Sequence, residues 1–467
     1  MRPHYPPARA AVVVGGSVTG LLAAHVLAEH VEQVTVVERD RLPDGPVFRK
    51  GVPQSRQHHI LWSRGLDAIE GLLPGLRADL LAAGALPIAL PADVLWFNAA
   101  GWSRRFPATH EILSCSRDLL DHLVRSRVRQ AGRVGFLTGY EAAGLLVDGS
   151  RVRGLRLRSR PGEAGGQPDV PADLVVDASG RSSRMPRWLS EVGRQPPAES
   201  RVEAFLGYAS SQYRLPQLRD ADWKGLLIQA KAPDDPRGGS IFPIEGDRFM
   251  VTLVGAAHDH PSTDAAGFLA FARSLRSPLL YESVRHGEAL TSIRGYQRTA
   301  NLRRHYDRLR DLPDGVVVLG DAACALNPLY AHGMTVAALQ AVALDRRLRQ
   351  AGTNPGRLSR QIQRDAARCA DGAWLIATGE DLRYPTTVGG RATLPVRLTH
   401  RYLARVNRTA CADRRVAGAL LDVLNLVGRP ESLFHPRVAA RALLAGSAAP
   451  LADPPTTRPA VARDTAA

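Results

Sequence analysis

The residues of this chain best suited to chemistry are those that bind a phosphorylated, sugar-bearing ligand, and they gather at two glycine-rich turns. The first turn is Gly15-Gly16-Ser17-Val18-Thr19-Gly20, between the apolar run 11–14 and the helical pattern 21–27. Glu38 follows at the end of a β-branched run, where a dinucleotide-binding unit presents an acid to a ribose hydroxyl. The order strand, turn, helix, strand, acid predicts a nucleotide-binding βαβ unit.

The second turn, Gly320-Asp321, follows the apolar strand pattern 315–319 and leads through Pro328 to a helix near Gly333 and Met334. Small residues let the backbone approach a phosphate, and the N–H groups at a helix start can bind one. Two such turns so far apart in the chain predict one large cofactor that contacts both.

Other candidate residues lie between these turns. Arg117 stands in the first turn of a predicted helix, where a cation is locally unfavourable, so either a phosphate or a neighbouring aspartate (Asp118 or Asp121) balances it. The basic, proline-broken loop 48–62 suits an anionic ligand. Three histidines, His58, His59 and His332, are candidate acids or bases, although a structural or positional role is the simpler interpretation for each.

Composition limits the classes of partner. The chain has 467 residues and a formal net charge of +16, but only three of its 61 basic residues are lysine and the arginines are dispersed. No nucleic-acid-binding spacing accompanies them, so an anionic cofactor or an acidic substrate is a better explanation than nucleic acid. The four cysteines are widely spaced without a C-x-x-C pair, which predicts free thiols, a reducing compartment and no structural metal.

The N-terminus does not resemble a signal peptide, and no apolar stretch is long enough to span a bilayer. We therefore expect a cytoplasmic protein without a membrane span. Residues 448–467 are rich in Pro, Thr, Ala and Asp, without periodicity, and are expected to form a disordered tail.

The elements that must position these residues are predicted from periodicity. A hairpin is expected over 144–158, a buried strand ending at Asp177, antiparallel strands over 203–259, and helices over 264–275, 278–286, 355–380, 396–409 and 412–426. The expected fold is α/β with an α+β insert, in which a Rossmann-like cofactor-binding domain (8–195 and 295–350) is interrupted by an antiparallel β-sheet substrate domain (196–294). A C-terminal helical region (351–447) completes it.

Taken together, these motifs resemble the FAD-binding elements of class A flavin monooxygenases, which have the p-hydroxybenzoate hydroxylase-like fold. Within that family the chain is most similar to the polyether epoxidases of lasalocid and monensin biosynthesis. The shared strings are Arg49-Lys50-Gly51-Val52-Pro53-Gln54, Gly101-Trp102 with Arg105-Phe106-Pro107, Ser116-Arg117-Asp118-Leu119-Leu120-Asp121, Pro243-Ile244-Glu245-Gly246, and Asn327-Pro328 with Tyr330 and His332-Gly333-Met334.

This resemblance implies FAD as cofactor, NAD(P)H as a transient reductant and O₂ as oxidant. It implies epoxidation of one or more alkenes of a polyketide or polyene in antibiotic biosynthesis, through a C4a-hydroperoxyflavin. The substrate would be apolar, with or without a carboxylate, free or carrier-bound, and the enzyme a monomer or homodimer. The implied FAD-binding residues are Gly15, Gly16, Ser17, Val18, Thr19, Gly20, Glu38, Arg39, Arg49, Lys50, Val52, Arg56, Arg117, Asp177, Gly320, Asp321, Pro328, Gly333 and Met334.

The flavin itself would do the chemistry, and Tyr330, Ala331 and His332 would line the oxygen site, with His332 nearest the flavin. Ala331 stands where the family has a glycine close to the oxygen-reacting edge, and its methyl group is harmless if its φ is negative. Gln57 likewise stands where the epoxidases carry a histidine.

These departures keep a second hypothesis open, a redox-neutral cyclase with a structural FAD, similar to the decalin synthases. A third, a non-enzymatic binder similar to the Rab GDP-dissociation inhibitors, is disfavoured by the full set of FAD motifs. A flavin halogenase is disfavoured because no W-x-W-x-I-P segment occurs.

Overall fold

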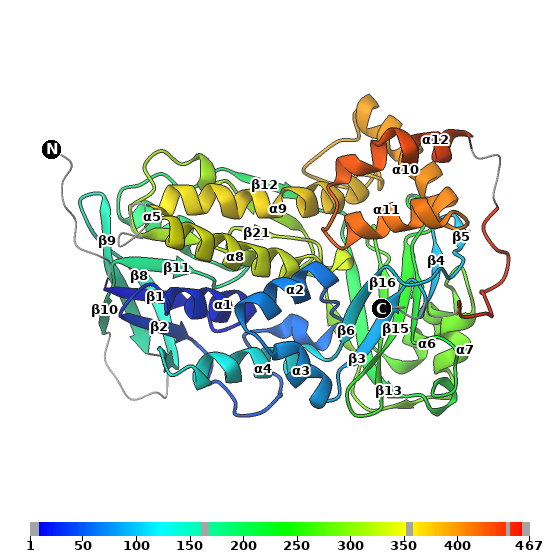
Figure 1. The fold of residues 1–467 in the computed structure, drawn as a ribbon, viewed down its shortest axis with the longest axis horizontal. Coiled ribbons are helices and arrows are strands. Elements are labelled where there is room, and N and C mark those ends of the chain that lie inside the picture. Colours follow the sequence, from blue (N-terminus) through cyan, green and yellow to red (C-terminus); the bar gives the residue numbers. More distant parts are fainter. Residues whose placement is uncertain (1–8, 160–167, 352–357, 445–448, 460–467) are drawn as a thin grey trace, which may run out of the picture.

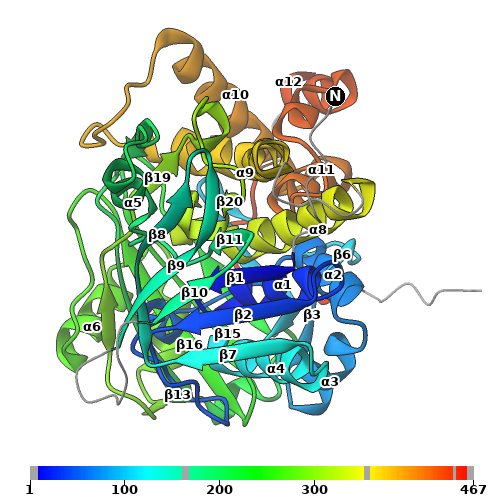
Figure 2. The same ribbon diagram turned by 90° about the vertical axis from the view of Figure 1, so that its left-hand side faces the viewer.

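The computed structural model describes residues 9–159, 168–351, 358–444 and 449–459. At the centre of one half lies a parallel sheet of five strands in the order β20-β11-β1-β2-β7 (Figure 2). Its strands are β1 (Ala10–Val14), β2 (Gln33–Glu38), β7 (Val134–Thr138), β11 (Leu174–Asp177) and β20 (Val316–Val318). The β1–β2 register pairs Val14 with Val37, which brings the first glycine turn beside the end of β2.

Both faces of this sheet are covered, which explains why its strands are apolar runs and not alternating patterns. Ala11 and Val13 face the helices α1 (Val18–Leu27), α2 (Ser63–Leu72), α4 (Arg117–Gln130) and α8 (Gly333–Ala351). Val12 and Val14 face the sheet of β8 (Tyr140–Asp148), β9 (Arg151–Ser159) and β10 (Asp169–Pro171), together with α5 (Met185–Glu191). The predicted hairpin around Asp148-Gly149 is thus confirmed.

The second half is an eight-stranded sheet in the order β17-β13-β16-β15-β14-β4-β5, with β18 beside β13 (Figure 1). Its strands are β13 (Gly207–Arg214), β14 (Gly225–Ile228), β15 (Arg237–Ile244), β16 (Arg248–Gly255), β17 (Glu288–Ala289), β18 (Arg294–Tyr296), β4 (Val94–Asn98) and β5 (Gly101–Trp102). Helices α6 (Ala265–Arg273) and α7 (Leu279–Val284) pack on it through Phe268 and Leu280.

Two strands of this sheet come from a segment that we expected in the cofactor domain. Strand β4 pairs with β14 in parallel, from Val94 with Gly225 to Phe97 with Ile228, and β5 continues from it. Residues 94–102 therefore lie in the sheet of the insert, although our expected boundaries assign them to the first domain. The local sequence predicts a strand but carries no signal for the sheet that it joins, because its partner is far away in the chain.

Smaller elements connect the two halves. Strands β12 (Glu199–Val202), β19 (Asn301–Arg304) and β21 (Cys324–Ala325) form a three-stranded sheet, and β3 (Leu86–Leu90) pairs with β6 (His110–Ser114). Helix α3 (Leu76–Ala82) packs on α4. The chain thus crosses between the halves several times, which places residues from both beside the glycine turns.

The C-terminal region is helical, as predicted, with α9 (Ser359–Asp381), α10 (Leu394–Ala410), α11 (Arg414–Leu424) and α12 (Pro436–Leu444) (Figure 1). The fold class is confirmed: a mixed α/β cofactor domain, an antiparallel insert and a helical C-terminal region. All four cysteines are free thiols. In the described ranges no helix is long and apolar enough to cross a membrane.

The expected disordered tail is wrong for residues 449–459. The Leu451 N–H donates to the Trp102 carbonyl at 3.1 Å, so that this segment pairs with strand β5. Arg458 forms an ion pair with the buried Asp93 carboxylate (2.5 Å), which Lys224 also contacts at 3.2 Å. These contacts could not be predicted from the sequence pattern, because they use single residues and backbone groups and not a repeated apolar face. The rest of the expected tail, residues 448 and 460–467, lies outside the described residues.

Candidate functional site

The first glycine turn is packed too closely for any larger residue. Gly15 has φ of +104°, and a Cβ atom there would lie 2.6 Å from the Ala178 carbonyl oxygen. A Cβ atom on Gly20 would lie 1.8 Å from the Gly15 oxygen, so Gly20 lets α1 approach the end of β1. Ser17 caps α1 without a side-chain hydrogen bond to the helix, so its hydroxyl and the first N–H groups of α1 remain available beside the cavity.

Glu38 lies at the end of β2 and supports this turn. Its carboxylate accepts the Gly16 N–H at 2.7 Å and the Asp40 N–H at 3.0 Å, while one side of it lines the cavity. Arg49 lies behind it, donating to the Gly16 carbonyl at 3.1 Å and pairing with Glu38 at 3.4 Å. Arg49 was expected to bind the cofactor, but it does not line the cavity. Its side chain instead supports the first glycine turn, through the Gly16 carbonyl and the Glu38 carboxylate.

Arg117 resolves the two alternatives that its sequence left open, because it has an acidic partner and also faces the cavity. Its Nε donates to Asp121 at 2.8 Å, one helical turn later, and not to Asp118. One terminal nitrogen donates to the Ser17 hydroxyl at 3.0 Å, which brings the guanidinium to the N-terminus of α1. The side chain is buried and lines the cavity, so Asp121 fixes its direction while its charge faces the ligand space.

The second glycine turn meets the first at the same cavity. Gly320 has φ of +58°, and a Cβ atom there would lie 2.6 Å from the Thr19 hydroxyl. Asp321 lines the cavity beside it, next to Gly333 at the start of α8. Within the part of the chain that the structure describes, the Asp321 carboxylate makes no hydrogen bond or ion pair. Burial raises its pKa, opposed by the charges of Arg181 and Arg117. A half-buried carboxylate on the cavity wall, without a donor from the described residues, can accept a hydrogen bond from a ligand.

The loop before α8 turns only some of its residues toward this cavity. Pro328 and Ala331 line it, together with Gly333 and Met334, whereas Tyr330 and His332 do not. His332 faces the opposite way, toward α11, with its Nε2 at 2.9 Å from the Leu424 carbonyl, and burial lowers its pKa to about 4. Of the three residues expected to line an oxygen site, only Ala331 therefore lines this cavity.

The backbone conformation of Ala331 decides whether its methyl group crowds the cavity, and this conformation is left-handed. Its φ is +54° and its ψ is 25°, in the left-handed region that costs an L-residue roughly 1–2 kcal/mol. The condition under which its methyl group would be harmless, a negative φ, is not met. The loop has the shape that a glycine would favour, and it carries a methyl group on the cavity wall.

Two neighbouring histidines line the cavity on the side of the second sheet. Burial, together with the adjacent charges, lowers the pKa of His58 and of His59 to about 3, so both are neutral at pH 7. His59 Nδ1 donates to the Gln57 carbonyl at 2.8 Å, which leaves Nε2 as an acceptor. Gln57 is fixed between strands, accepting the Ser210 hydroxyl at 2.6 Å and donating to the Arg294 carbonyl at 3.0 Å.

The cavity has a volume of about 540 Å³. The residues named from the sequence that line it are Gly15, Ser17, Val18, Thr19, Glu38, Arg39, Lys50, Val52, Arg117, Asp321, Pro328, Ala331, Gly333 and Met334. The others named, Gly16, Gly20, Arg49, Arg56, Asp177, Gly320, Tyr330 and His332, lie behind this layer. Among the described side chains no cluster of His, Cys, Asp or Glu could hold a metal ion.

Two of the residues behind the layer have clear structural partners. The Asp177 carboxylate accepts the Ser179 N–H at 2.9 Å and the Ser183 hydroxyl, and so shapes the turn after β11. The Arg56 guanidinium lies 3.8 Å from the Phe48 ring centroid. Neither residue needs a ligand to satisfy its polar groups.

Some lining residues were not among the candidates. Arg181 belongs to the Asp177-Ala178-Ser179-Gly180-Arg181 string and could have been found there; it donates to the Leu326 carbonyl at 3.1 Å. Tyr208 and Tyr296 face each other across the β13–β18 pair and both line the cavity. Only the pairing of these strands shows this, and no local motif marks it.

A two-domain fold with two glycine turns, a charged cavity between them and an antiparallel sheet beside it defines a flavin-dependent monooxygenase or halogenase-like flavoprotein. The chain belongs to the family described as "FAD binding domain", which it matches over residues 9–359. It is 31% identical over 383 residues to Protein Rv3254 of Mycobacterium tuberculosis, covering 80% of each chain. It is 28% identical to kynurenine 3-monooxygenase of Salinispora arenicola over 366 residues, covering 76% of this chain and 75% of the relative.

Solved structures share the fold at lower identity. The flavin-dependent brominase Bmp2 superposes with a TM-score of 0.65 at 16% identity, covering 93% of this chain and 97% of that one. The anhydrotetracycline hydroxylase OxyS of Streptomyces rimosus gives 0.57 at 18% identity, with 90% and 76% covered. At such identities the likeness concerns the fold alone. The family identifies an FAD binding domain, and the solved structures show that its fold is the class A flavin monooxygenase and halogenase-like fold.

Proposed function

We propose that FAD binds across the cavity between the two glycine turns. The adenosine half would contact Glu38 and Arg39, the pyrophosphate would meet Arg117 and the N-terminus of α1, and Asp321 would accept a hydroxyl of the ribityl chain. The N-terminus of α8 at Gly333 would face the pyrimidine end of the flavin, where its N–H groups stabilise negative charge. The observation that carries this proposal is the half-buried Asp321 carboxylate on the cavity wall, which has no donor among the described residues.

The reaction proposed is epoxidation of an alkene in a polyketide or polyene. FAD held in this cavity would supply the redox chemistry, in which NAD(P)H provides two electrons, one oxygen atom of O₂ goes to the alkene and the other leaves as water. An alkene acceptor needs no side-chain base, which agrees with the neutral His58 and His59 on the cavity wall. The chain would then bind the substrate, orient it and exclude water.

An apolar substrate is supported by the surroundings of His58. Its ring stacks on Phe242 with centroids 4.6 Å apart, and Phe242 belongs to a cluster with Ile60, Trp62 and Trp96. Ile60 also lines the cavity. The resemblance to the polyether epoxidases includes the Pro243-Ile244-Glu245-Gly246 turn beside this cluster, which favours a polyene over a small polar substrate.

The test is turnover of a synthetic polyene with isotopically heavy O₂ and NADH or NADPH. The proposal predicts that the substrate stimulates nicotinamide oxidation and that each epoxide gains one heavy oxygen atom. A polyene-dependent product that contains no oxygen from O₂ would contradict it.

A second candidate function, redox-neutral cyclisation with FAD as a structural group, is favoured by one observation, the methyl group of Ala331 in a left-handed loop. This hypothesis predicts turnover that is undiminished without O₂ and without reductant. The same substrate panel, incubated under argon with the oxidised protein, distinguishes it from the epoxidase. Product formed at an equal rate under argon supports the cyclase.

A further inference from the structure

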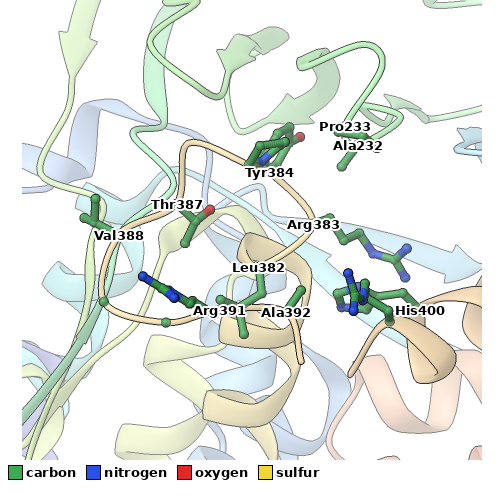
Figure 3. Close-up of a pocket in the computed structure, with 14 residues that line it drawn as sticks. Ala232, Pro233, Leu382, Arg383, Tyr384, Thr387, Val388, Arg391, Ala392 and His400 are labelled. Carbon is green, nitrogen blue, oxygen red and sulfur yellow. The ribbon is translucent and has the colours of Figure 1, made fainter. Parts of the chain in front are cut away.

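A second cavity lies apart from the cofactor cavity, at the junction of the C-terminal helices and the second sheet (Figure 3). Its volume is about 710 Å³, within the range of small-molecule sites. The loop 382–392 after α9 forms most of its wall, Arg397 and His400 of α10 form another part, and Ala232 and Pro233 complete it from the sheet side. It shares no lining residue with the cofactor cavity.

The wall of this cavity is cationic and contains no acidic residue. Arg383, Arg391 and Arg397 all line it. Arg383 pairs with Glu380, outside the wall, at 2.7 Å, whereas the side chains of the exposed residues Arg391 and Arg397 make no hydrogen bond or ion pair to any described residue. Across residues 382–412 the sequence has six arginines and no Asp or Glu. Guanidinium groups gathered without a counter-charge indicate an anionic ligand.

The polar groups between these arginines also suit an anion. His400 donates its Nε2 proton to the Gly379 carbonyl at 2.7 Å, and burial and the nearby Arg383 lower its pKa, so the positive charge of this wall comes from the arginines. In Figure 3 Arg383 and His400 lie on one side of the cavity and Arg391 on the other, with Leu382 and Ala392 between them. Guanidinium groups from two directions can clamp a phosphate, because each forms paired N–H bonds to two of its oxygens.

The wall also includes an aromatic ring that connects it to the cofactor cavity. Tyr384 lines the arginine cavity and belongs to the same apolar cluster as Tyr208, which lines the cofactor cavity. One apolar cluster therefore contributes a tyrosine to each cavity. A ligand whose phosphate lay among the arginines would place its organic part against Tyr384 and Pro233.

We propose that this cavity is a second binding site, specific for the phosphate group of an organic phosphate ester. Two ligands carry that chemistry: a nicotinamide dinucleotide and a 4′-phosphopantetheine-bearing molecule such as a coenzyme A thioester. Phosphate binding in this cavity does not depend on the proposed function. Binding of NAD(P)H there as the reductant would rest on that proposed function.

The test is calorimetric titration of the full flavin-loaded protein with NADPH, NADH and coenzyme A at low ionic strength. The variant is the pair Arg391→Ala and Arg397→Ala, and the matched control is Arg401→Ala with Arg405→Ala, which removes two exposed charges from the next two turns of α10 after Arg397. Neither control residue lines the cavity. At least one ligand should bind the wild type and the control equally, and the cavity variant roughly 10- to 100-fold more weakly, as expected for lost charge-assisted bonds.

If NADPH or NADH binds more tightly than coenzyme A, the ligand is the reductant. If coenzyme A binds more tightly than either nucleotide, the ligand is the pantetheine-bearing molecule. Either result supports the site. The proposal is overturned if no ligand binds the wild type, or if cavity and control variants weaken binding equally, since net charge alone would then explain it. Flavin content and thermal unfolding report on folding. If the cavity variant does not fold, hydrogen exchange of loop 382–392 in the wild type, with and without ligand, decides: absence of ligand-dependent protection overturns the proposal. Loss of FAD from all variants would instead contradict the cofactor site.

Discussion

Replacement of Ala331 by glycine tests the conformation of the loop before α8 and its effect on oxygen together. The change removes one methyl group from the cavity wall and leaves every hydrogen bond of the loop in place, including the Ala331 N–H to the Pro328 carbonyl at 2.9 Å. A left-handed φ costs an alanine roughly 1–2 kcal/mol, and glycine in turn loses about 0.4–1 kcal/mol more entropy on folding. The net prediction is a protein more stable by about 0.5–1 kcal/mol.

Ala257 provides a matched control. It has the same φ of +54° and lies in the turn after β16, where it does not line the cofactor cavity. Ala257→Gly should therefore raise the free energy of unfolding by a similar amount, measured by urea denaturation, without any effect on the flavin. A fall in stability of more than about 1 kcal/mol in Ala331→Gly alone would show that the loop does not have a left-handed residue at this position.

The two variants should differ in their reaction with oxygen. If the methyl group is as close to the reacting oxygen as its place on the wall suggests, relief of about 1.4 kcal/mol of crowding speeds that reaction tenfold. The assay is stopped-flow reoxidation of the chemically reduced protein at several O₂ concentrations, followed by the visible absorbance of the flavin. Equal second-order rate constants for the wild type, Ala331→Gly and Ala257→Gly would refute our reasoning, and the cyclase would then lose its specific support.

Three further substitutions test the cofactor site and its support. Asp321→Asn removes a half-buried charge without a donor, so the apoprotein should become more stable to urea, by up to about 1 kcal/mol, while FAD binds roughly tenfold more weakly in a fluorescence titration; equal affinity would exclude contact with the cofactor. Arg117→Met should weaken FAD binding about 10- to 100-fold, whereas Arg129→Met, on the exposed end of α4, should leave it unchanged, and equal losses would show a general charge effect. Burial raises the pKa of Asp381 from 3.8 to about 7, so the folded state holds a proton that the unfolded state has lost. Stability is therefore highest below pH 4 with respect to this group, and falls between pH 4 and 7 by up to about 4 kcal/mol, a slope that Asp381→Asn should remove from urea unfolding curves.

Asp381 is a useful residue for this measurement because it connects the two cavities. Its carboxylate accepts the amide groups of Asn301 at 2.7 Å and Asn327 at 2.9 Å. Asn327 begins the loop that carries Pro328 and Ala331, and Asp381 ends the helix before the arginine-lined loop 382–392. Its titration should therefore affect the positions of both walls.

The sequence identified the glycine turns correctly because their geometry is local. Gly20 is required by the Gly15 carbonyl oxygen of its own segment, and the strand-turn-helix order places that atom. Gly15 and Gly320 are also limited by atoms of distant segments, the Ala178 carbonyl and the Thr19 hydroxyl, which the local pattern does not show. The directions of Tyr330 and His332 could not be predicted in this way. They depend on the left-handed turn at Ala331 and on packing against α9 and α11, which the chain reaches only after many more residues.

The difference between local and long-range contacts also explains which parts of the fold could be predicted. The β15–β16 hairpin follows from the turn Glu245-Gly246-Asp247, whose last two residues have φ of +75° and +57°. Strands β4 and β5, by contrast, find their partner in a sheet that forms from residues after 206. Charge pairing across long distances, as between Asp93 and Arg458, leaves no periodic signal in the sequence.

The segment 449–459 has a consequence for how the protein is made. Strand β5 lies at the edge of the sheet, and its free backbone groups are covered only when Leu451 pairs with Trp102. During synthesis that edge stays open until almost all of the described chain has left the ribosome. A polypeptide stalled or cleaved before residue 449 would fold with an unprotected strand and with the Asp93 carboxylate lacking Arg458.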